Sequence, residues 1–243
     1  MNEKVSILNC HVDLCGVEDA LERVLSAINE NINFQIVTIN PEMIINAQKN
    51  KAFFDIVNSA DLVIPDGVGV KIALKLKGIK INQIRGIDFS RLLIKTAAQK
   101  GYKIGLLGAK EEVIQKAKEN ILKEFPTLDI AYIRNGYFSD DNEIIEQIKN
   151  ADLKILLVGL GSPKQEELIY KLKSELKGTA MIGVGGSFDV FSGIVKEAPL
   201  IYRKLGLEWL YRTILQPERF KRIFPLLPIF LIKCIISTVM NKD

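Results

Sequence analysis

Short apolar segments alternate with helix-like segments through most of the chain, and this alternation limits the fold more than any other feature. It predicts an α/β protein with a doubly wound, mostly parallel Rossmann-like sheet and right-handed crossovers. The predicted strands are residues 5–9, 34–39, 62–64, 104–107, 128–133 and 155–160, with a further strand beginning at Met181. The predicted helices are residues 17–29, a segment opening at Pro41, and residues 68–76, 89–99, 111–124, 140–149 and 167–176.

Composition indicates one large α/β domain, or one domain with an appendage. A chain of 243 residues with 48% hydrophobic and 26% charged residues can bury a full core. The formal charge of +4 is too small to predict binding of nucleic acid through overall charge. Three cysteines and a single histidine, His11, predict neither the usual four-ligand zinc site nor a disulfide scaffold. The first four residues lack the regions of a signal peptide, so we expect a cytoplasmic protein.

The stretch from Asp61 to Val70 is where we expect the chemistry. The apolar run 62–64 predicts a strand that a parallel sheet buries on both faces, and Pro65 ends it by withholding a backbone donor. Asp66 then precedes a glycine turn, which predicts a carboxylate at a carboxyl strand end, where open α/β sheets bind ligands. The alternative is that Asp66 only caps the helix that follows.

Polar residues at two other places point to the same edge of the predicted sheet. Thr38 and Asn40 end a strand, although Thr38 also fits an ordinary strand position and Asn40 fits a helix cap before Pro41. Arg85 stands beside a glycine and can reach a phosphate with its planar fork of donors. A solvated loop charge is the alternative for Arg85, and Asp88 is predicted to cap the next helix.

Two glycine-rich segments follow successive strands, at Gly159 to Glu166 and at Gly183 to Asp189. Close backbone approach and free amides at a helix start suit an anion, so the pair predicts a groove for a diphosphate. The first segment places Lys164 where a dinucleotide fingerprint has its third glycine, and no G-K-S or G-K-T follows for a P-loop. An ordinary glycine-rich turn remains the alternative for each segment alone.

The last part of the chain, residues 196–243, differs in composition from the predicted catalytic domain, residues 1–195. Strand and helix patterns stop alternating, and aromatic, aliphatic and basic residues mix at helical spacing from Pro199 onward. This predicts a helical appendage in which Arg212, Arg219 and Arg222 approach one side.

The apolar segment 223–240 predicts contact between the appendage and a membrane. Pro225, Pro228 and Lys233 interrupt the segment, and only residues 229–240 form an unbroken candidate helix. A bilayer span needs about 20 apolar residues, so the segment is expected to lie in the interface. A helix pair docked on the core, or a subunit contact, are the alternatives.

Six segments taken together resemble the WecG/TagA/CpsF family of bacterial glycosyltransferases, and within it the TagA type. Their order and spacing match across nearly the whole chain. The segments are Val37 to Glu42, Pro65 to Gly69, Arg85 to Asp88, Gly159 to Glu166, Gly183 to Asp189 and Leu207 to Arg212.

The resemblance implies an inverting transfer of N-acetylmannosamine from its UDP derivative to the 4-hydroxyl of N-acetylglucosamine on undecaprenyl diphosphate, for the linkage unit of wall teichoic acid. It implies no metal and no cofactor, and the sequence holds no D-x-D. Asp66 would be the general base. The implied donor site comprises Thr38, Asn40, Arg85, Gly159, Gly161, Gln165, Glu166, Gly185 and Asp189.

The resemblance also implies that Arg212, Arg219 and Arg222 hold the lipid diphosphate on the inner face of the cell membrane. Glu197 departs from the family, which commonly has arginine there. Three other readings stay open: a related transferase that uses the uronic acid or UDP-glucose, a non-catalytic nucleotide-binding scaffold, and a nicotinamide-dependent oxidoreductase, which the missing third glycine disfavours. The sequence leaves a homo-oligomer open.

Overall fold

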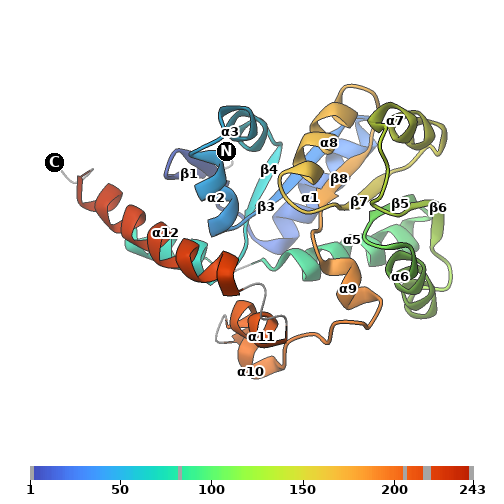
Figure 1. Ribbon diagram of the computed structural model, residues 1–243. Helices are drawn as coiled ribbons and strands as arrows, with labels where there is room; N and C mark the ends of the chain where they lie inside the picture. Colours follow the sequence, from blue (N-terminus) through green and yellow to red (C-terminus); the bar gives the residue numbers. More distant parts are fainter. Residues whose placement is uncertain (1–2, 82–83, 205–206, 216–219, 241–243) are drawn as a thin grey trace.

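A computed structural model describes residues 3–81, 84–204, 207–215 and 220–240. Its centre is a six-stranded sheet in which every pairing is parallel and the strand order is β4-β3-β8-β7-β5-β6 (Figure 1). The prediction of a doubly wound parallel sheet is confirmed. The strands are β3 (Phe34–Ile39), β4 (Leu62–Pro65), β5 (Lys103–Gly108), β6 (Asp129–Arg134), β7 (Ile155–Gly159) and β8 (Ala180–Gly183).

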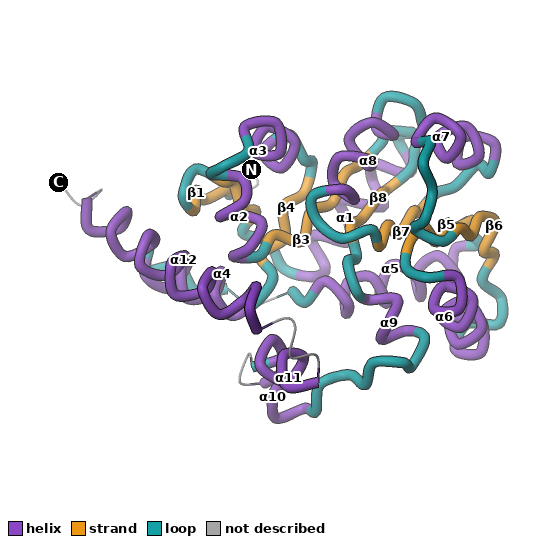
Figure 2. The backbone as a smooth tube through the Cα atoms, viewed as in Figure 1, coloured by secondary structure: helices purple, strands orange, loops and turns teal. Residues whose placement is uncertain are grey.

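Helices cover both faces of the sheet, and Figure 2 shows the strands as a layer between them. Alternate residues of the strands face opposite ways, so Ile36 and Val37 of β3 belong to different apolar cores. The first face carries α1 (Val17–Asn29), α5 (Gly86–Lys100), α6 (Glu111–Glu124) and α9 (Ser187–Phe191). The second face carries α2 (Pro41–Ala47), α3 (Lys51–Asn58), α4 (Val68–Leu76), α7 (Asp141–Asn150) and α8 (Lys164–Lys173).

The connections that follow two neighbouring central strands run to opposite faces of the sheet. β3 is followed by α2 on the second face, whereas β8, which pairs with β3, is followed by α9 on the first face. Where successive connections diverge in this way, the carboxyl ends of the strands border a crevice that binds ligands in open α/β sheets. The candidate site is therefore expected beside the ends of β3 and β8.

The N-terminal residues form a hairpin, whereas the sequence predicted a single strand at residues 5–9. Strand β1 (Lys4–Ile7) pairs antiparallel with β2 (Cys10–Asp13). The turn between them places Leu8 at φ 48° and Asn9 at φ 67°, the left-handed conformation that two-residue hairpin turns require. The buried Asp13 carboxylate accepts a 2.8 Å hydrogen bond from the amide of Val63, which fixes the hairpin beside β4.

Three helices form the C-terminal part: α10 (Leu200–Lys204), α11 (Glu208–Leu215) and α12 (Phe220–Met240). The first two lie as a small pair beyond the sheet, and α12 returns to pack on α2 and α4 (Figure 1). The side chains of Phe230 and Cys234 are buried in that contact. In the described ranges, no helix combines the length and the apolar character that crossing a bilayer needs.

The predicted start of the last helix at residue 229 is wrong, because α12 already begins at Phe220 and continues through Pro225 and Pro228. A proline inside a helix removes one backbone hydrogen bond and crowds the carbonyl four residues earlier. Packing against α2 and α4 then holds a helix that the prolines alone would interrupt.

Candidate active site

Asp66 lies at the carboxyl end of β4, on the sheet edge where the sequence predicts it. Its amide donates a 2.8 Å hydrogen bond to the carbonyl of Ile39, which ties the turn after β4 to the end of β3. The side chain is half-buried. Gly67, the residue after Asp66, occupies the cap position of α4.

Gly86, the first residue of α5, lies between Asp66 and Thr38. A methyl group placed on the Cα of Gly86 would come 3.3 Å from Asp66 Oδ2 and 3.2 Å from Thr38 Cγ2. The start of α5 therefore adjoins the Asp66 carboxylate, and the positive end of a helix dipole favours negative charge there. The prediction that Asp88 caps this helix is wrong, because the helix begins at Gly86, three residues before the predicted start, and Arg85 takes the cap position.

Thr38 and Asn40 lie on the same edge but have different partners. The Thr38 hydroxyl donates a 3.4 Å hydrogen bond to the carbonyl of Gly183, which links the end of β3 to the end of β8. The Asn40 side-chain oxygen accepts a 3.0 Å hydrogen bond from the amide of Met43 and caps α2. The capping prediction for Asn40 is confirmed, and this use leaves its amide nitrogen for a ligand.

Gln165 and Glu166 form a buried pair under the β8 turn. Gln165 accepts a 3.0 Å hydrogen bond from the amide of Gly185 and donates a 2.7 Å hydrogen bond to Glu166 Oε1. Glu166 is only 2% exposed. Burial raises the pKa of this carboxyl from 4.5 to about 7, even though the hydrogen bond from Gln165 acts to lower it. Near neutral pH the side chain therefore holds a proton part of the time.

The predicted glycines differ in what surrounds them. A methyl group on Gly159 would come 2.6 Å from the Phe188 ring and 2.9 Å from the carbonyl oxygen of Gly185, so this glycine allows close packing. Gly161, at φ 78°, and Gly185, at φ 50°, have open space where a side chain would stand. Of the three predicted glycines, Gly161 and Gly185 therefore present an open backbone surface at the strand ends.

The helix after the first glycine turn starts earlier than predicted. α8 begins at Lys164, three residues before the predicted start, because the amide of Gln165 already donates to the carbonyl of Gly161. Pro163 takes the cap position of α8. Asp189 lies in the first turn of α9, where its carbonyl accepts hydrogen bonds from Val195 and Ser192.

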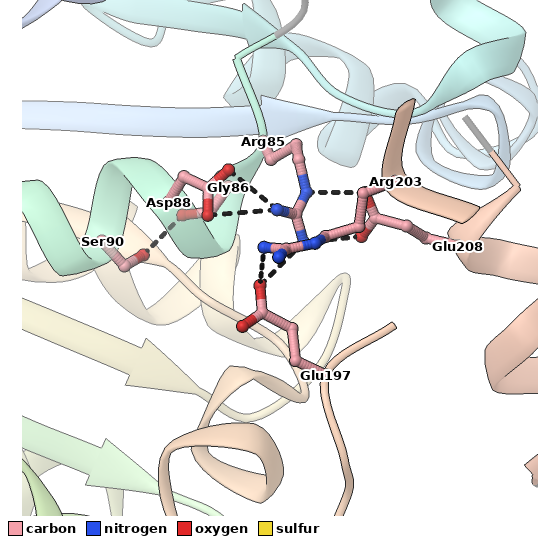
Figure 3. Close-up of polar contacts among 7 residues, drawn as sticks. All are labelled: Arg85, Gly86, Asp88, Ser90, Glu197, Arg203 and Glu208. Atoms are coloured by element: carbon pink, nitrogen blue, oxygen red, sulfur yellow. Dashed lines mark hydrogen bonds and ion pairs between the residues drawn. The ribbon is translucent and has the colours of Figure 1, made fainter. Parts of the chain in front are cut away.

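Arg85 is enclosed by three carboxylates (Figure 3). Its Nη1 lies 2.9 Å from Asp88 Oδ2, and its Nη2 lies 3.2 Å from Glu197 Oε1. Glu208 binds it with both oxygens, at 2.6 Å from Nε and 2.9 Å from Nη2. Burial alone would lower the pKa of Arg85, but hydrogen bonds and charge from Glu208, with Asp88 and Glu197, outweigh it and raise the pKa. The guanidinium is thus charged and paired, not a solvated loop charge.

The predicted acceptor arginines lie largely outside the described residues. Arg219 belongs to a segment that the structure does not describe, and Arg212 and Arg222 are described only as backbone of α11 and α12. Sequence reasoning missed two other residues at this edge, Glu208 and Gly86. Each lies inside a segment that carries the family resemblance, which is the only signal that pointed to them.

Comparison with known proteins decides the family. The model of the "Glycosyl transferase WecG/TagA/CpsF family" matches residues 5–243. The chain belongs to this family. A protein of Bacillus subtilis (strain 168), named N-acetylglucosaminyldiphosphoundecaprenol N-acetyl-beta-D-mannosaminyltransferase, is 39% identical over 197 residues, 81% of this chain and 77% of that protein. A protein of the same name from Staphylococcus aureus (strain NCTC 8325 / PS 47) is 35% identical over 234 residues, 95% of this chain and 91% of that protein.

Membership in the WecG/TagA/CpsF family makes the chain a glycosyltransferase, and the matched region includes both the sheet and the C-terminal helices. The sheet edge offers a half-buried carboxylate, a hydroxyl, two open glycine turns and two helix starts. In the described part of the chain, no three His, Cys, Asp or Glu side chains gather closely enough to hold a metal ion.

Proposed function

We propose that this chain transfers N-acetylmannosamine from UDP-N-acetylmannosamine to the 4-hydroxyl of N-acetylglucosamine on undecaprenyl diphosphate. The relatives from Bacillus and Staphylococcus are named for the transfer of N-acetyl-beta-D-mannosamine to N-acetylglucosaminyldiphosphoundecaprenol. The observation that carries the proposal for this chain is the half-buried Asp66 carboxylate at the carboxyl ends of the strands, beside Thr38 and the start of α5. The product would be the β-1,4-linked disaccharide of the wall teichoic acid linkage unit.

Asp66 acts as the general base in this proposal. The acceptor oxygen attacks the anomeric carbon from the face opposite the nucleotide, its proton passes to Asp66, and the bond from that carbon to the diphosphate oxygen breaks. UDP leaves, and the configuration inverts. General-base catalysis of this kind typically contributes about 100- to 10,000-fold in rate.

The departing diphosphate needs positive partners. The open backbone turns at Gly161 and Gly185 let a diphosphate approach the main chain closely, and the start of α8 supplies the positive end of a helix dipole. Thr38, Asn40 and Gln165 are the proposed sugar or nucleotide contacts. Glu166 supports this surface from below through Gln165, and Gly159 supports it by letting Phe188 pack closely.

In this proposal, the C-terminal helices bind the acceptor and contact the membrane. One side of α12 packs on the core, and its other side exposes a row of apolar residues that suits the interfacial region of a bilayer. We propose that Arg212, Arg219 and Arg222 bind the lipid diphosphate at the inner face of the cell membrane. The exposed residues are Ile229, Ile232, Ile235, Ile236, Val239 and Met240.

The test measures UDP release with lipid-linked N-acetylglucosamine and a panel of UDP sugars. We expect the N-acetylmannosamine donor to be preferred and Asp66→Asn to lower kcat by at least about 100-fold. Asp129→Asn is the matched control. Asp129 is an exposed carboxylate at the start of β6, which is the outermost strand on the side of the sheet away from β4. A folded Asp66→Asn protein with wild-type turnover would refute the base assignment, and preference for UDP-glucose or the uronic acid would refute the donor.

A further inference from the structure

The ion-pair cluster around Arg85 joins residues that are far apart in the sequence. Asp88 belongs to the first turn of α5, Glu197 to the connection before α10, and Glu208 opens α11. Arg203 of α10 also lies 2.7 Å from Glu197, so the cluster holds two guanidinium groups and three carboxylates (Figure 3). It is the polar connection between the sheet domain and the α10–α11 pair.

The contact between Arg85 and Glu208 has the geometry of a strong ion pair. Nη2 donates a 2.9 Å hydrogen bond to one oxygen of the Glu208 carboxylate, and the other oxygen lies 2.6 Å from Nε as an ion pair. The side chains are only 14% and 21% exposed, so water screens the pair poorly. Arg85 is the single described partner of the Glu208 carboxylate, whereas Arg85 has two further acids. Glu208 therefore depends on Arg85 for its position.

We propose that Arg85 and Glu208 form a latch that positions α11 beside the catalytic edge, so that Arg85 acts as a positioning residue for the acceptor site. Arg85 directly precedes Gly86, the residue on which an added methyl group would contact both Asp66 and Thr38. Glu208 is the first residue of α11, and Arg212 follows one turn later, about 6 Å along the helix axis. The latch thereby fixes the arginine-bearing helix relative to the proposed base. This inference rests on the proposed function for the role of Arg212.

Glu197 strengthens the latch. It accepts hydrogen bonds from both Arg85 and Arg203, at 3.2 and 2.7 Å. Both Nη groups of Arg85 donate to these acids, and its Nε is buried beside Glu208. In the latch, Arg85 therefore positions the acceptor helix α11, whereas the sequence predicted that Arg85 binds the donor phosphate.

The first test measures opening of the latch without any substrate. Lys196 is exposed in the connection before α10, and trypsin cleaves there faster when the α10–α11 pair detaches. We expect Arg85→Gln and Glu208→Gln each to speed cleavage after Lys196 by about tenfold, and the double variant to be no faster than Arg85→Gln, because partners in one contact are not additive. Glu119→Gln, which breaks the exposed pair with Lys116 on α6, is the control and should cleave like wild type.

The second test separates positioning from donor binding. Glu208→Gln should raise KM for lipid-linked N-acetylglucosamine by about tenfold and leave KM for the UDP sugar unchanged. If Arg85 instead binds the donor diphosphate, freeing it with Glu208→Gln should lower KM for the UDP sugar, and Arg85→Gln should raise it. That result would overturn the latch, and so would wild-type cleavage at Lys196 in both single variants. A protein that transfers no sugar would refute the proposed function, while the cleavage rates would still judge the latch.

Discussion

Gly86 lies so close to Asp66 that a methyl group on its Cα would come 3.3 Å from the carboxylate oxygen Oδ2. The backbone of Gly86 has no left-handed conformation that would require glycine. The absence of a side chain at this position therefore preserves space beside the proposed base. A substitution at Gly86 should therefore change activity without a matching change in stability.

Gly86→Ala should lower activity without unfolding the protein. Alanine favours a helix over glycine by up to about 1 kcal/mol, so the free energy of unfolding should stay within about 1 kcal/mol of wild type. The added methyl presses on Asp66 and Thr38, and small misplacement of reacting groups is costly, so kcat/KM should fall by about tenfold or more. Urea unfolding and UDP release measure the two effects.

Gly16→Ala is the matched control for this substitution. Gly16 caps α1, also at negative φ, and a methyl there would meet only Glu18 at an ordinary 3.6 Å. We expect wild-type kcat/KM. Equal losses in both variants, or a Gly86→Ala protein as active as wild type, would contradict the role assigned to the space beside Asp66.

Gly159→Ala should destabilise the fold more than Gly161→Ala. The methyl at position 159 would come 2.6 Å from the Phe188 ring, and overpacking of this kind costs about 1–3 kcal/mol, occasionally more. At position 161 the space is open, and the cost is the left-handed backbone, about 1–2 kcal/mol. Urea unfolding compares the two. The cost at position 159 should shrink in a Phe188→Ala background, and strict additivity of the two substitutions would disprove the packing explanation.

The strand ends could be predicted from the sequence because their signals are local. The apolar run before Pro65 and the glycines after residue 158 mark where strands stop, and all of these turns meet at one edge of the sheet. The hairpin at Leu8 and Asn9 was missed because neither residue is the glycine that usually marks such a turn.

Contacts that depend on tertiary structure gave no local signal. Glu208 binds Arg85 across 123 positions, and its sequence neighbourhood resembles any amphipathic helix start. Pro225 and Pro228 predicted a break in the last helix, but packing of Phe230 against α2 and α4 overrides this local preference. The proposed base, Asp66, could therefore be predicted from the sequence, whereas the residues that surround it could be identified only from the fold.

Glu166 should make the protein less stable as pH rises. The folded protein holds the Glu166 proton up to a pKa of about 7, compared with an ordinary value of 4.5. Between these values the folded state binds more protons than the unfolded state, so the free energy of unfolding falls as pH increases and levels off above about 7. Each pKa unit corresponds to about 1.4 kcal/mol, which gives a total of about 3 kcal/mol.

Glu166→Gln removes this dependence because glutamine keeps the shape and cannot ionise. Relative to wild type, the variant should gain about 3 kcal/mol between pH 4.5 and pH 8 in urea unfolding. The Gln165 hydrogen bond can be retained by the new amide oxygen. Wild-type and variant curves that run parallel over this range would show that Glu166 is already ionised in the folded state.

The two sides of α12 should respond differently to substitution. Phe230 is fully buried against α2 and α4, and truncation of a buried phenylalanine to alanine costs about 3–5 kcal/mol, so Phe230→Ala should undock or destabilise the helix. Ile232 and Ile236 are 56% and 52% exposed, and serine at both positions should change stability by less than about 0.5 kcal/mol each.

The exposed pair tests the proposed membrane contact directly. Burial of apolar side chains in the interface drives binding of an amphipathic helix, so the Ile232→Ser/Ile236→Ser variant should bind liposomes with anionic lipids about tenfold more weakly than wild type. Tyr137→Ser is the control, because Tyr137 is 70% exposed on the sheet domain, away from α12. If the isoleucines instead formed a contact between two copies of the chain, the double variant would lower the sedimenting mass in the absence of lipid and leave liposome binding unchanged. In assays on liposomes, the double variant should show a higher KM for the lipid-linked acceptor and a wild-type kcat at saturation. This result would show that the substitutions weaken membrane binding and leave the chemical step unchanged.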